Sequence, residues 1–381
     1  MRVGSTVSWC ALGTALVFWG AVAGVFAQQQ PQGVAMSETF FKNVQILKGI
    51  PVDEFMATMG FFSASTGLNC TDCHVEESGG DWAKYADDNN LKRTTRRMIQ
   101  MVTAINQTNF GRQAVTCYTC HRGGSRPTTV PSIDLLYGTP PPAEPGAATA
   151  QAQGQPPVDQ ILDRYLGALG GVERLNSLRS FTGTGTYMGY DDAEKSAMEI
   201  YAKAPAQRTL VAHPPPGDFT WTFDGNQGWL VAPTTDRPLP ITTITGQDLE
   251  GLKVETQVLF PSAIKQALTK WRVGIPTEID GREVQVVQGN TAKGGTVTLC
   301  FDTESGLLTR LIRIADSPVG PIVTRVDYSD YRDVSGVKMP FKWIVSWLNG
   351  RSIFELTSVQ PNAQVDAARF ARPAAPVASR P

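Results

Sequence analysis

The pentapeptide C-x-x-C-H occurs twice in this chain, and no other sequence feature constrains the fold as strongly. The first copy is Cys70-Thr71-Asp72-Cys73-His74, and the second is Cys117-Tyr118-Thr119-Cys120-His121. Two thiols three positions apart can add to the two vinyl groups of one haem, and the following His can then bind the iron. The repeat therefore predicts two covalently bound haems c. The predicted attachment and iron-binding residues are Cys70, Cys73, His74, Cys117, Cys120 and His121.

Other uses of paired cysteines fit this sequence less well. The chain has six cysteines and three histidines, and the two motifs account for four and two of them. A zinc site built from both pairs is the main alternative. The stretch between Cys73 and Cys117, however, is much longer than the ~15–20 residues usual for paired zinc knuckles. A thioredoxin-like redox pair needs a βαβ context, which the sequence does not predict.

The second iron ligand of each haem can be narrowed by elimination. Beyond the two motif histidines only His213 remains, in a distant Ala-His-Pro turn. Methionine is a common alternative ligand in cytochromes c and raises the reduction potential. Met56 and Met59 are the candidates for the first haem, and Met98 and Met101 for the second. Ordinary core packing is the competing role for all four.

Composition divides the chain into four segments. Arg2, an apolar stretch and the site Val25-Phe26-Ala27 predict a cleaved signal peptide and a periplasmic protein, with an uncleaved membrane anchor as the alternative. No other segment is long and apolar enough to cross a bilayer. A stretch rich in Pro, Ala, Gln and Thr predicts an extended linker. The predicted boundaries are 1–27 for the signal peptide, 37–126 for a helical domain, 127–157 for the linker and 158–373 for a strand-rich domain.

Helical periodicity places the candidate methionines on two helices, each of which precedes a motif. Pro51 predicts the start of the first helix and Gly67 its end. The second helix is predicted from Leu91 to Ile105. Four cations on it are either partners for haem propionates or part of a solvated face: Lys92, Arg93, Arg96 and Arg97.

The strand-rich region, residues 158–373, predicts an antiparallel meander. It opens with an amphipathic helix from Val158 to Leu169, and hairpin turns are predicted at Asp224-Gly225 and Asp280-Gly281. A helical insert is predicted from Gly246 to Trp271, and Cys300 reads as a small buried hydrophobe rather than a reactive thiol. The predicted fold class is thus mixed. It combines a small, mostly α-helical multihaem cytochrome c domain, a Pro/Ala/Gln linker and an antiparallel β-rich half-barrel.

The helical region resembles the cytochrome c subunit of photosynthetic reaction centres and its relatives in non-photosynthetic bacteria. The resemblance covers about residues 40–124 and rests on segments 42–47, 68–74, 96–98 and 115–123. It implies that a helix supplies an axial Met to each haem. The matching position for the second haem is Met98, and Met59 is the first choice for the first haem, with Met56 as the alternative. The family holds four haems, whereas this chain has two motifs.

The strand-rich region is similar to periplasmic lipoprotein-carrier (LolA/LolB-like) half-barrels. Phe223-Asp224-Gly225 and Trp229 are the most suggestive residues. The resemblance implies a concave apolar face for a lipid, a quinone or a protein partner, and a scaffold or docking module is the alternative. The region shows no catalytic constellation.

Together these features predict a periplasmic dihaem c-type cytochrome that passes electrons between redox partner proteins and is not an enzyme. Two alternatives stay open. One is a haem enzyme with an open iron site, and the other is an envelope ligand-binding protein with a haem-bearing module. The 34 Lys and Arg against 35 Asp and Glu give no electrostatic case for a nucleic-acid partner.

Overall fold

The computed structural model describes residues 33–74, 81–131, 133, 138, 151–190, 192–215, 217–233 and 238–374. The chain divides into two compact units, Met1–Gly33 and Val34–Pro381, and every element below lies in the second. The predicted signal peptide therefore falls outside the described residues, as does most of the predicted linker. Among the helices that are described, none has the length and apolar character needed to cross a membrane.

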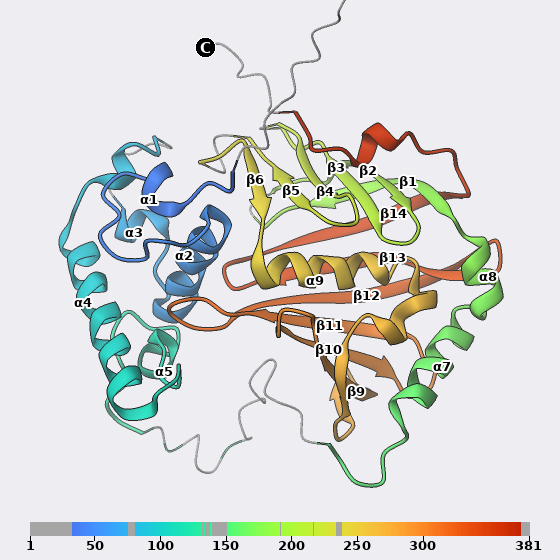
Figure 1. Ribbon diagram of the computed structural model, residues 1–381, viewed down its shortest axis with the longest axis horizontal. Helices are drawn as coiled ribbons and strands as arrows, with labels where there is room; N and C mark the ends of the chain where they lie inside the picture. Colours follow the sequence, from blue (N-terminus) through green and yellow to red (C-terminus); the bar gives the residue numbers. More distant parts are fainter. Residues whose placement is uncertain are drawn as a thin grey trace, which may run out of the picture. The chain divides into compact units, whose positions relative to one another are not determined.

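The N-terminal part of the described chain is helical (Figure 1). Its longest helices are α2 and α4, which carry the candidate methionines and confirm the two predicted helices. Pro51 precedes α2, Asp53 and Glu54 occupy its first turn, and Gly67 ends it in the left-handed conformation with φ 68°. The elements are α1 (Ser37–Phe40), α2 (Val52–Thr66), α3 (Cys70–Cys73), η2 (Lys84–Ala86), α4 (Asn90–Ile105), η3 (Asn106–Phe110) and α5 (Cys117–His121).

One large antiparallel sheet makes up most of the rest, as the strand pattern predicted. The strands run in the order β6-β5-β4-β3-β2-β1-β14-β13-β12-β11-β10-β9-β7, and β8 pairs with β9 outside this path. Their bounds are β1 (Ser180–Met188), β2 (Ser196–Lys203), β3 (Gln207–Ala212), β4 (Phe219–Phe223), β5 (Gly228–Val231), β6 (Ile241–Ile244), β7 (Thr269–Val273), β8 (Thr277–Ile279), β9 (Arg282–Asn290), β10 (Thr296–Asp302), β11 (Leu308–Ala315), β12 (Ile322–Val334), β13 (Val337–Trp347) and β14 (Gly350–Pro361).

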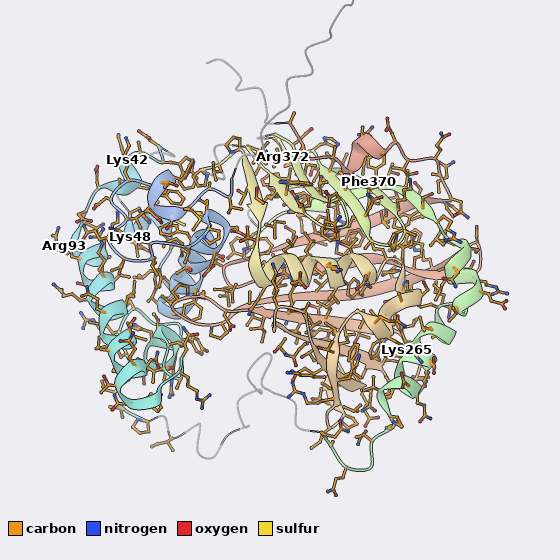
Figure 2. All side chains as sticks on the ribbon, viewed as in Figure 1. Lys42, Lys48, Arg93, Lys265, Phe370 and Arg372 are labelled. Carbon is orange, nitrogen blue, oxygen red and sulfur yellow. The ribbon has the colours of Figure 1, made fainter. Side chains whose placement is uncertain are left out.

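The core lies between the sheet and the helices that accompany it. The predicted opening helix is α7 (Val158–Ala168), whose residues Leu162 and Tyr165 are almost fully buried. α8 (Val172–Ser177), which the sequence did not predict, and η5 (Ala367–Phe370) flank the strands. The side chain of Phe370, labelled in Figure 2, is buried and only 2% exposed. Cys300 is buried as predicted, and burial raises the pKa of its thiol to about 12.

The predicted helical insert is only partly helical. α9 (Gly246–Gln257) and the 3-10 helix η4 (Pro261–Gln266) occupy most of it, and Pro261 starts the second piece. The prediction was wrong at the end, because Thr269 to Trp271 belong to β7, which pairs with β9. Sheet pairing there outweighs local helical preference.

The two predicted hairpins are confirmed. Asp224 and Gly225 lie in the loop between β4 and β5, and Asp280 and Gly281 connect β8 to β9. Asp280 and Gly281 both have positive φ, at 51° and 77°, as a two-residue type I′ turn requires.

Helix α2 packs against the strand-rich part of the same compact unit. Phe61 of α2 is 5% exposed and shares an apolar cluster with Ala315, Val319 and Ile322. A Cβ atom on Gly320 would lie 2.3 Å from the Phe61 ring, so only glycine leaves room for this side chain. At the start of α2, the Asp53 carboxylate accepts hydrogen bonds from the Thr245 N–H and hydroxyl groups at 2.6 and 2.9 Å.

The end of the predicted linker also contacts the sheet. The Ala152 N–H group donates to the Val273 carbonyl at 2.8 Å, and the Gln151 side chain accepts from the Val273 N–H group at 3.0 Å. Gln151 and Ala152 thus lie beside β7, and Gln155 accepts from Gln285 of β9 at 3.1 Å, which the composition of this segment did not predict.

Candidate functional site

The two C-x-x-C-H motifs share the same local architecture. Asn69 precedes α3, where its side chain accepts from the Asp72 N–H group at 3.0 Å and the Asp72 carboxylate accepts from the Asn69 N–H group at 2.8 Å. Thr116 and Thr119 form the equivalent pair before α5. Such a reciprocal capping box fixes the start of a helical turn. Each motif therefore begins its turn at the first cysteine, with the second cysteine three positions on.

Both motif histidines are oriented by a backbone carbonyl. His74 Nδ1 lies 3.0 Å from the Tyr85 carbonyl oxygen, and His121 Nδ1 lies 3.0 Å from the Gly124 carbonyl oxygen. Because a carbonyl oxygen only accepts, each Nδ1 must carry the hydrogen, which leaves the Nε2 lone pair available. Metal-binding histidines usually have this outer hydrogen bond. The arrangement of both imidazoles therefore fits coordination of a haem iron through Nε2.

None of the four motif cysteines forms a disulfide. Cys70 and Cys120 are exposed, whereas burial raises the pKa of the Cys73 and Cys117 thiols. Raised pKa values are the opposite of what a reactive redox pair needs. Within the part of the chain that the structure describes, no three His, Cys, Asp or Glu residues gather in a way that could hold a metal ion. The two cysteine pairs thus do not converge as a joint zinc site would require.

A cavity of about 1260 Å³ brings motif residues and candidate methionines together. Met56, Met59 and Met98 all line it, whereas Met101 does not and is 44% exposed. Of the two candidates on α4, Met98 is therefore the one placed beside the motifs. Five motif residues line the same cavity: Cys70, Cys73, His74, Cys117 and His121.

Helix α2 also touches the second motif. The Gly123 N–H group donates to the Ser65 carbonyl at 2.9 Å. A Cβ atom on Gly67 would lie 2.4 Å from the Gly123 carbonyl oxygen, which explains the glycine that ends α2. α2 thus leads directly into the first motif and packs against the segment that follows the second.

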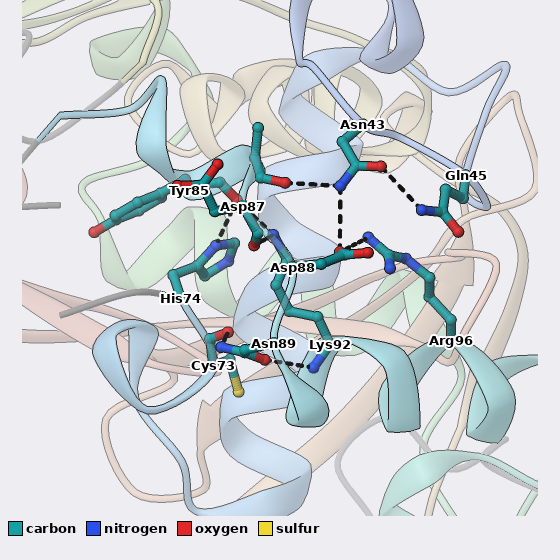
Figure 3. A network of polar contacts seen from close by, with 11 residues as sticks. Asn43, Gln45, Cys73, His74, Tyr85, Asp87, Asp88, Asn89, Lys92 and Arg96 are labelled. Carbon is teal, nitrogen blue, oxygen red and sulfur yellow. Dashed lines mark hydrogen bonds and ion pairs between the residues drawn. The ribbon is translucent and has the colours of Figure 1, made fainter. Parts of the chain in front are cut away.

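The surroundings of His74 form a polar network (Figure 3). The His74 ring stacks on the Tyr85 ring, with centroids 4.5 Å apart. Lys92 Nζ donates to the carbonyl oxygens of Tyr85 at 2.6 Å and Asp87 at 2.7 Å. The Asn89 side chain caps α4 and also donates to the Cys73 carbonyl at 2.8 Å. The network fixes the N-terminus of α4 to the first motif.

The four predicted cations on α4 divide into two kinds. Lys92 and Arg96 line the cavity, and Arg96 pairs with Asp88 at 2.7 Å. Arg93, labelled in Figure 2, and Arg97 are exposed and donate to side chains of their own helix. Arg93 and Arg97 therefore belong to a solvated face, whereas Lys92 and Arg96 are the cations of this set that line the cavity.

The cavity is also lined by residues of the sheet. Its aromatic wall includes Tyr187, Trp221, Trp343 and Phe354, whose rings lie within 5.2–5.8 Å of one another in successive pairs. This wall offers a large apolar surface beside the motif residues.

Several charged residues interrupt this apolar lining, and four of them lie close together on β3, α9 and β11. Arg313 is held by Glu255 at 2.6 Å and by Asp248. Arg208 lies 3.9 Å from Glu255, and its buried Nε has no hydrogen-bond partner among the described residues. An unpaired N–H group in such a place is costly. The Arg208 side chain lines the cavity and is 15% exposed.

Comparison with known proteins supports the cytochrome resemblance for the N-terminal part. Residues 21–159 match the family model described as photosynthetic reaction centre cytochrome C subunit. The subunit of that name from Thermochromatium tepidum is 40% identical over 92 residues, which are 23% of this chain and 22% of the relative. The one from Roseobacter denitrificans is 34% identical over 107 residues, which are 26% of this chain and 28% of the relative. This chain thus spans about a quarter of the length of these relatives.

Solved structures resemble the strand-rich part only weakly. A DUF1329 family protein from Desulfovibrio piger is 10% identical, with a TM-score of 0.40 and coverage of 57% of this chain and 98% of its own. A LolA superfamily protein from Nitrosomonas europaea is 12% identical, with a TM-score of 0.37 and coverage of 57% and 98%.

Sequence reasoning missed the groups that act around the motifs. The acceptors for His74 and His121 are main-chain oxygens, so the side chains of Tyr85 and Gly124 give no sign of this role. Arg208 could have been noticed as a cation on the apolar face of a strand, between Ala206 and Leu210. Nothing in the sequence alone shows that the Nε atom of Arg208 lacks a hydrogen-bond partner.

Proposed function

We propose that this protein is a dihaem c-type cytochrome that carries electrons between periplasmic redox proteins and is not an enzyme. The observation that carries the proposal is the repeated motif, in which each histidine holds its Nδ1 hydrogen on a carbonyl and keeps Nε2 free. When bound, haem c supplies a one-electron iron couple.

Each group of residues has a distinct role in this proposal. Cys70 and Cys73 attach the first haem, and Cys117 and Cys120 attach the second. The imidazoles of His74 and His121 bind iron from one side. Met98 is the proposed second ligand at the second haem, and Met59 at the first, with Met56 as the alternative; all three line the cavity.

Export supports covalent attachment. We propose that residues 1–27 are a signal peptide that is removed. The proposal follows from the resemblance to the reaction-centre cytochrome c subunit, which implies a periplasmic location. The mature chain would then have no integral membrane span, and its partners would be soluble or membrane-bound redox proteins.

The mass of the denatured chain tests the proposal. Protein produced with the haem-attachment machinery should carry the mass of two haems. The double variant Cys70→Ala/Cys73→Ala should carry one, as should Cys117→Ala/Cys120→Ala, whereas Cys300→Ala should keep both because Cys300 is buried in the sheet. A colourless exported protein without added mass, or one with zinc at these sulfurs, would remove the proposal.

A haem enzyme is the main competitor. It would need one iron with an open position for a small ligand. Rapid binding of carbon monoxide by the reduced wild-type protein would favour an enzyme, and failure to bind it would favour the electron carrier.

The cavity supports a second role for the strand-rich domain. We propose that it holds an apolar ligand with a hydrogen-bond acceptor at its head, which the guanidinium of Arg208 binds. The aromatic wall would pack against the apolar body of the ligand. The apolar lining and the guanidinium of Arg208 together favour an amphiphile over a fully apolar molecule.

Binding of a fluorescent long-chain fatty acid to the delipidated full chain tests this role. Arg208→Met should weaken binding by about tenfold, the loss expected for one hydrogen bond to a charged group. Arg272→Met is the matched control, because Arg272 also has a buried unpaired Nε but does not line the cavity. Equal effects of the two substitutions, or no binding by the wild-type chain, would refute the role.

A further inference from the structure

One carbonyl oxygen serves two donors beside the first motif. The Tyr85 oxygen accepts from His74 Nδ1 at 3.0 Å and from the Lys92 ammonium at 2.6 Å (Figure 3). A second carbonyl, that of Asp87, accepts from the same ammonium at 2.7 Å. Lys92 is therefore held in one place, two hydrogen bonds away from the proposed iron-binding ring.

This position is unfavourable for a lysine in two independent ways. Lys92 lies in the first turn of α4, where the helix dipole disfavours positive charge. It is also partly buried against the cavity, and burial lowers the pKa of its amino group. The stability of α4 alone would favour an acidic or neutral residue at this position. The positive charge of Lys92 therefore does not serve to stabilise the helix.

The second motif lacks this feature. The Gly124 oxygen accepts from His121 Nδ1, and no cation donates to it within the described parts of the chain. The two sites share the histidine geometry, but their capping boxes differ, with the Asp72 carboxylate at the first and the neutral Thr119 at the second. A cation bonded to the carbonyl that accepts from the histidine is found at the first.

The charges that face Lys92 do not cancel it. Asp88 is paired with Arg96 at 2.7 Å, which leaves that pair close to neutral. Asp87 is exposed, so its carboxylate is screened by water. Cys73 also faces Lys92, but a cysteine joined to haem as a thioether cannot ionise.

A cation at this carbonyl acts on the imidazole in two ways that have the same sign. It draws electron density from the oxygen, which weakens the hydrogen bond that this oxygen accepts from the His74 N–H group. The imidazole ring then becomes a poorer electron donor to a metal. Its charge also opposes any additional positive charge nearby, because Coulomb repulsion is strong at short range in a partly buried site. Both effects favour the reduced form of a bound iron.

We propose that Lys92 raises the reduction potential of the haem attached at Cys70 and Cys73. This proposal rests on the proposed dihaem function. Lys92 is a positioning residue, because it acts on the iron through the Tyr85 carbonyl and His74.

A redox titration of matched variants tests the proposal. Lys92→Gln keeps a donor of hydrogen bonds and removes the charge, and Arg93→Gln removes the neighbouring charge, which is exposed. Lys92→Gln should lower the reduction equilibrium constant of one haem by about tenfold, within the range for changes to such outer partners. A tenfold change equals ~59 mV for one electron. Lys92→Arg should restore most of the potential.

Single-haem proteins identify the affected site. In the Cys117→Ala/Cys120→Ala background only the first haem remains, and Lys92→Gln should shift its potential. In the Cys70→Ala/Cys73→Ala background the same substitution should leave the potential unchanged. An unchanged potential, an equal shift in Arg93→Gln, or a shift confined to the second haem would overturn the proposal. Absence of haem mass in the parent protein would instead refute the proposed function itself.

Discussion

At the scale of single residues, the two motifs differ less in themselves than in their neighbours. Both histidines are fixed by a carbonyl at 3.0 Å, yet only the carbonyl of Tyr85 also binds a cation. The candidate methionines differ in the same way. Met98 lines the cavity with the motif residues, whereas Met101, three positions later on α4, faces water. Of these two methionines, Met98 is therefore the one that we expect to bind a haem iron.

The proposed ligand at the second haem gives the first prediction. Met98→Ala should open one iron, so the reduced protein should bind carbon monoxide and lose the low-spin spectrum at that haem. Met101→Ala should leave both spectra unchanged, because this side chain is exposed and away from the cavity. Visible spectra with and without carbon monoxide measure the difference, and equal behaviour of the two variants would contradict Met98 as the ligand.

At the scale of elements, α2 connects the motif region to the sheet. Its first turn is bound by Thr245 at the start of α9, its middle packs Phe61 against Gly320, and its end meets Gly123. Each contact depends on one specific feature, namely a carboxylate, a glycine without a side chain, or a close approach of backbones. Substitutions there should act on the packing of α2 as a whole.

The contact between Phe61 and Gly320 gives the second prediction. Gly320→Ala should destabilise the protein by ~1–3 kcal/mol, the usual cost of forcing extra atoms into a packed site. Gly167→Ala on α7 should be neutral or stabilise by ~0.4–1 kcal/mol, since nothing lies near the added atom. Denaturant titrations measure both. Combining Gly320→Ala with Phe61→Leu should recover part of the loss, and a harmless Gly320→Ala would refute the steric account.

The carboxylate of Asp53 gives the third prediction, on pH. Burial raises its pKa above the ordinary value, although Thr245 donates hydrogen bonds to it. The folded state therefore binds the proton more tightly than the unfolded state does. The stability from this group is present at acid pH and lost as the pH rises through the raised pKa. Asp53→Asn should remove this loss and make the protein relatively more stable at neutral pH.

Glu355 provides a control of opposite sign. Hydrogen bonds from Lys195 and Lys342 lower the pKa of its carboxyl. Its contribution is therefore present at neutral pH and lost as the pH falls through the lowered pKa. Glu355→Gln should reduce stability at neutral pH, with the difference from wild type vanishing in acid. Melting temperatures between about pH 4 and pH 7 compare the two variants, and changes of the same sign would contradict these assignments.

At the scale of the whole molecule, the described chain has no clean separation between the motif region and the sheet. Phe61 and Ile99 from the helices share an apolar cluster with Ala315, Val319 and Ile322 from the strand-rich part. One cavity is lined by residues from both parts. Such shared burial couples the two parts when the protein unfolds.

This coupling gives the fourth prediction. Thermal unfolding followed by haem absorbance, which reports on the motifs, should coincide with unfolding followed by near-ultraviolet dichroism of the aromatic rings, which lie mostly in the sheet. In Phe61→Ala, which removes the central contact, the two transitions should separate. Separate transitions in the wild-type protein would show that the shared cluster does not couple the parts.

Local patterns determined the motifs, the two long helices, the hairpins and the antiparallel class of the sheet. They could do so because helix starts, positive-φ turns and C-x-x-C-H spacing depend on residues that are neighbours in sequence. The cytochrome resemblance of the N-terminal region was likewise readable and is matched over residues 21–159. The assignment of the attachment and axial residues stays a prediction.

Tertiary structure alone decided the rest. Thr269 to Trp271 became a strand because β9 offered hydrogen bonds, and Gly320 is required because Phe61 arrives from a helix far away in sequence. The cation near His74 acts through a main-chain oxygen, and every residue has such an oxygen whatever its side chain. Contacts of this kind join segments that are far apart in sequence. Local sequence patterns therefore do not predict them. The sequence therefore determined which chemistry the motifs can perform, and the packing determined what surrounds each of them.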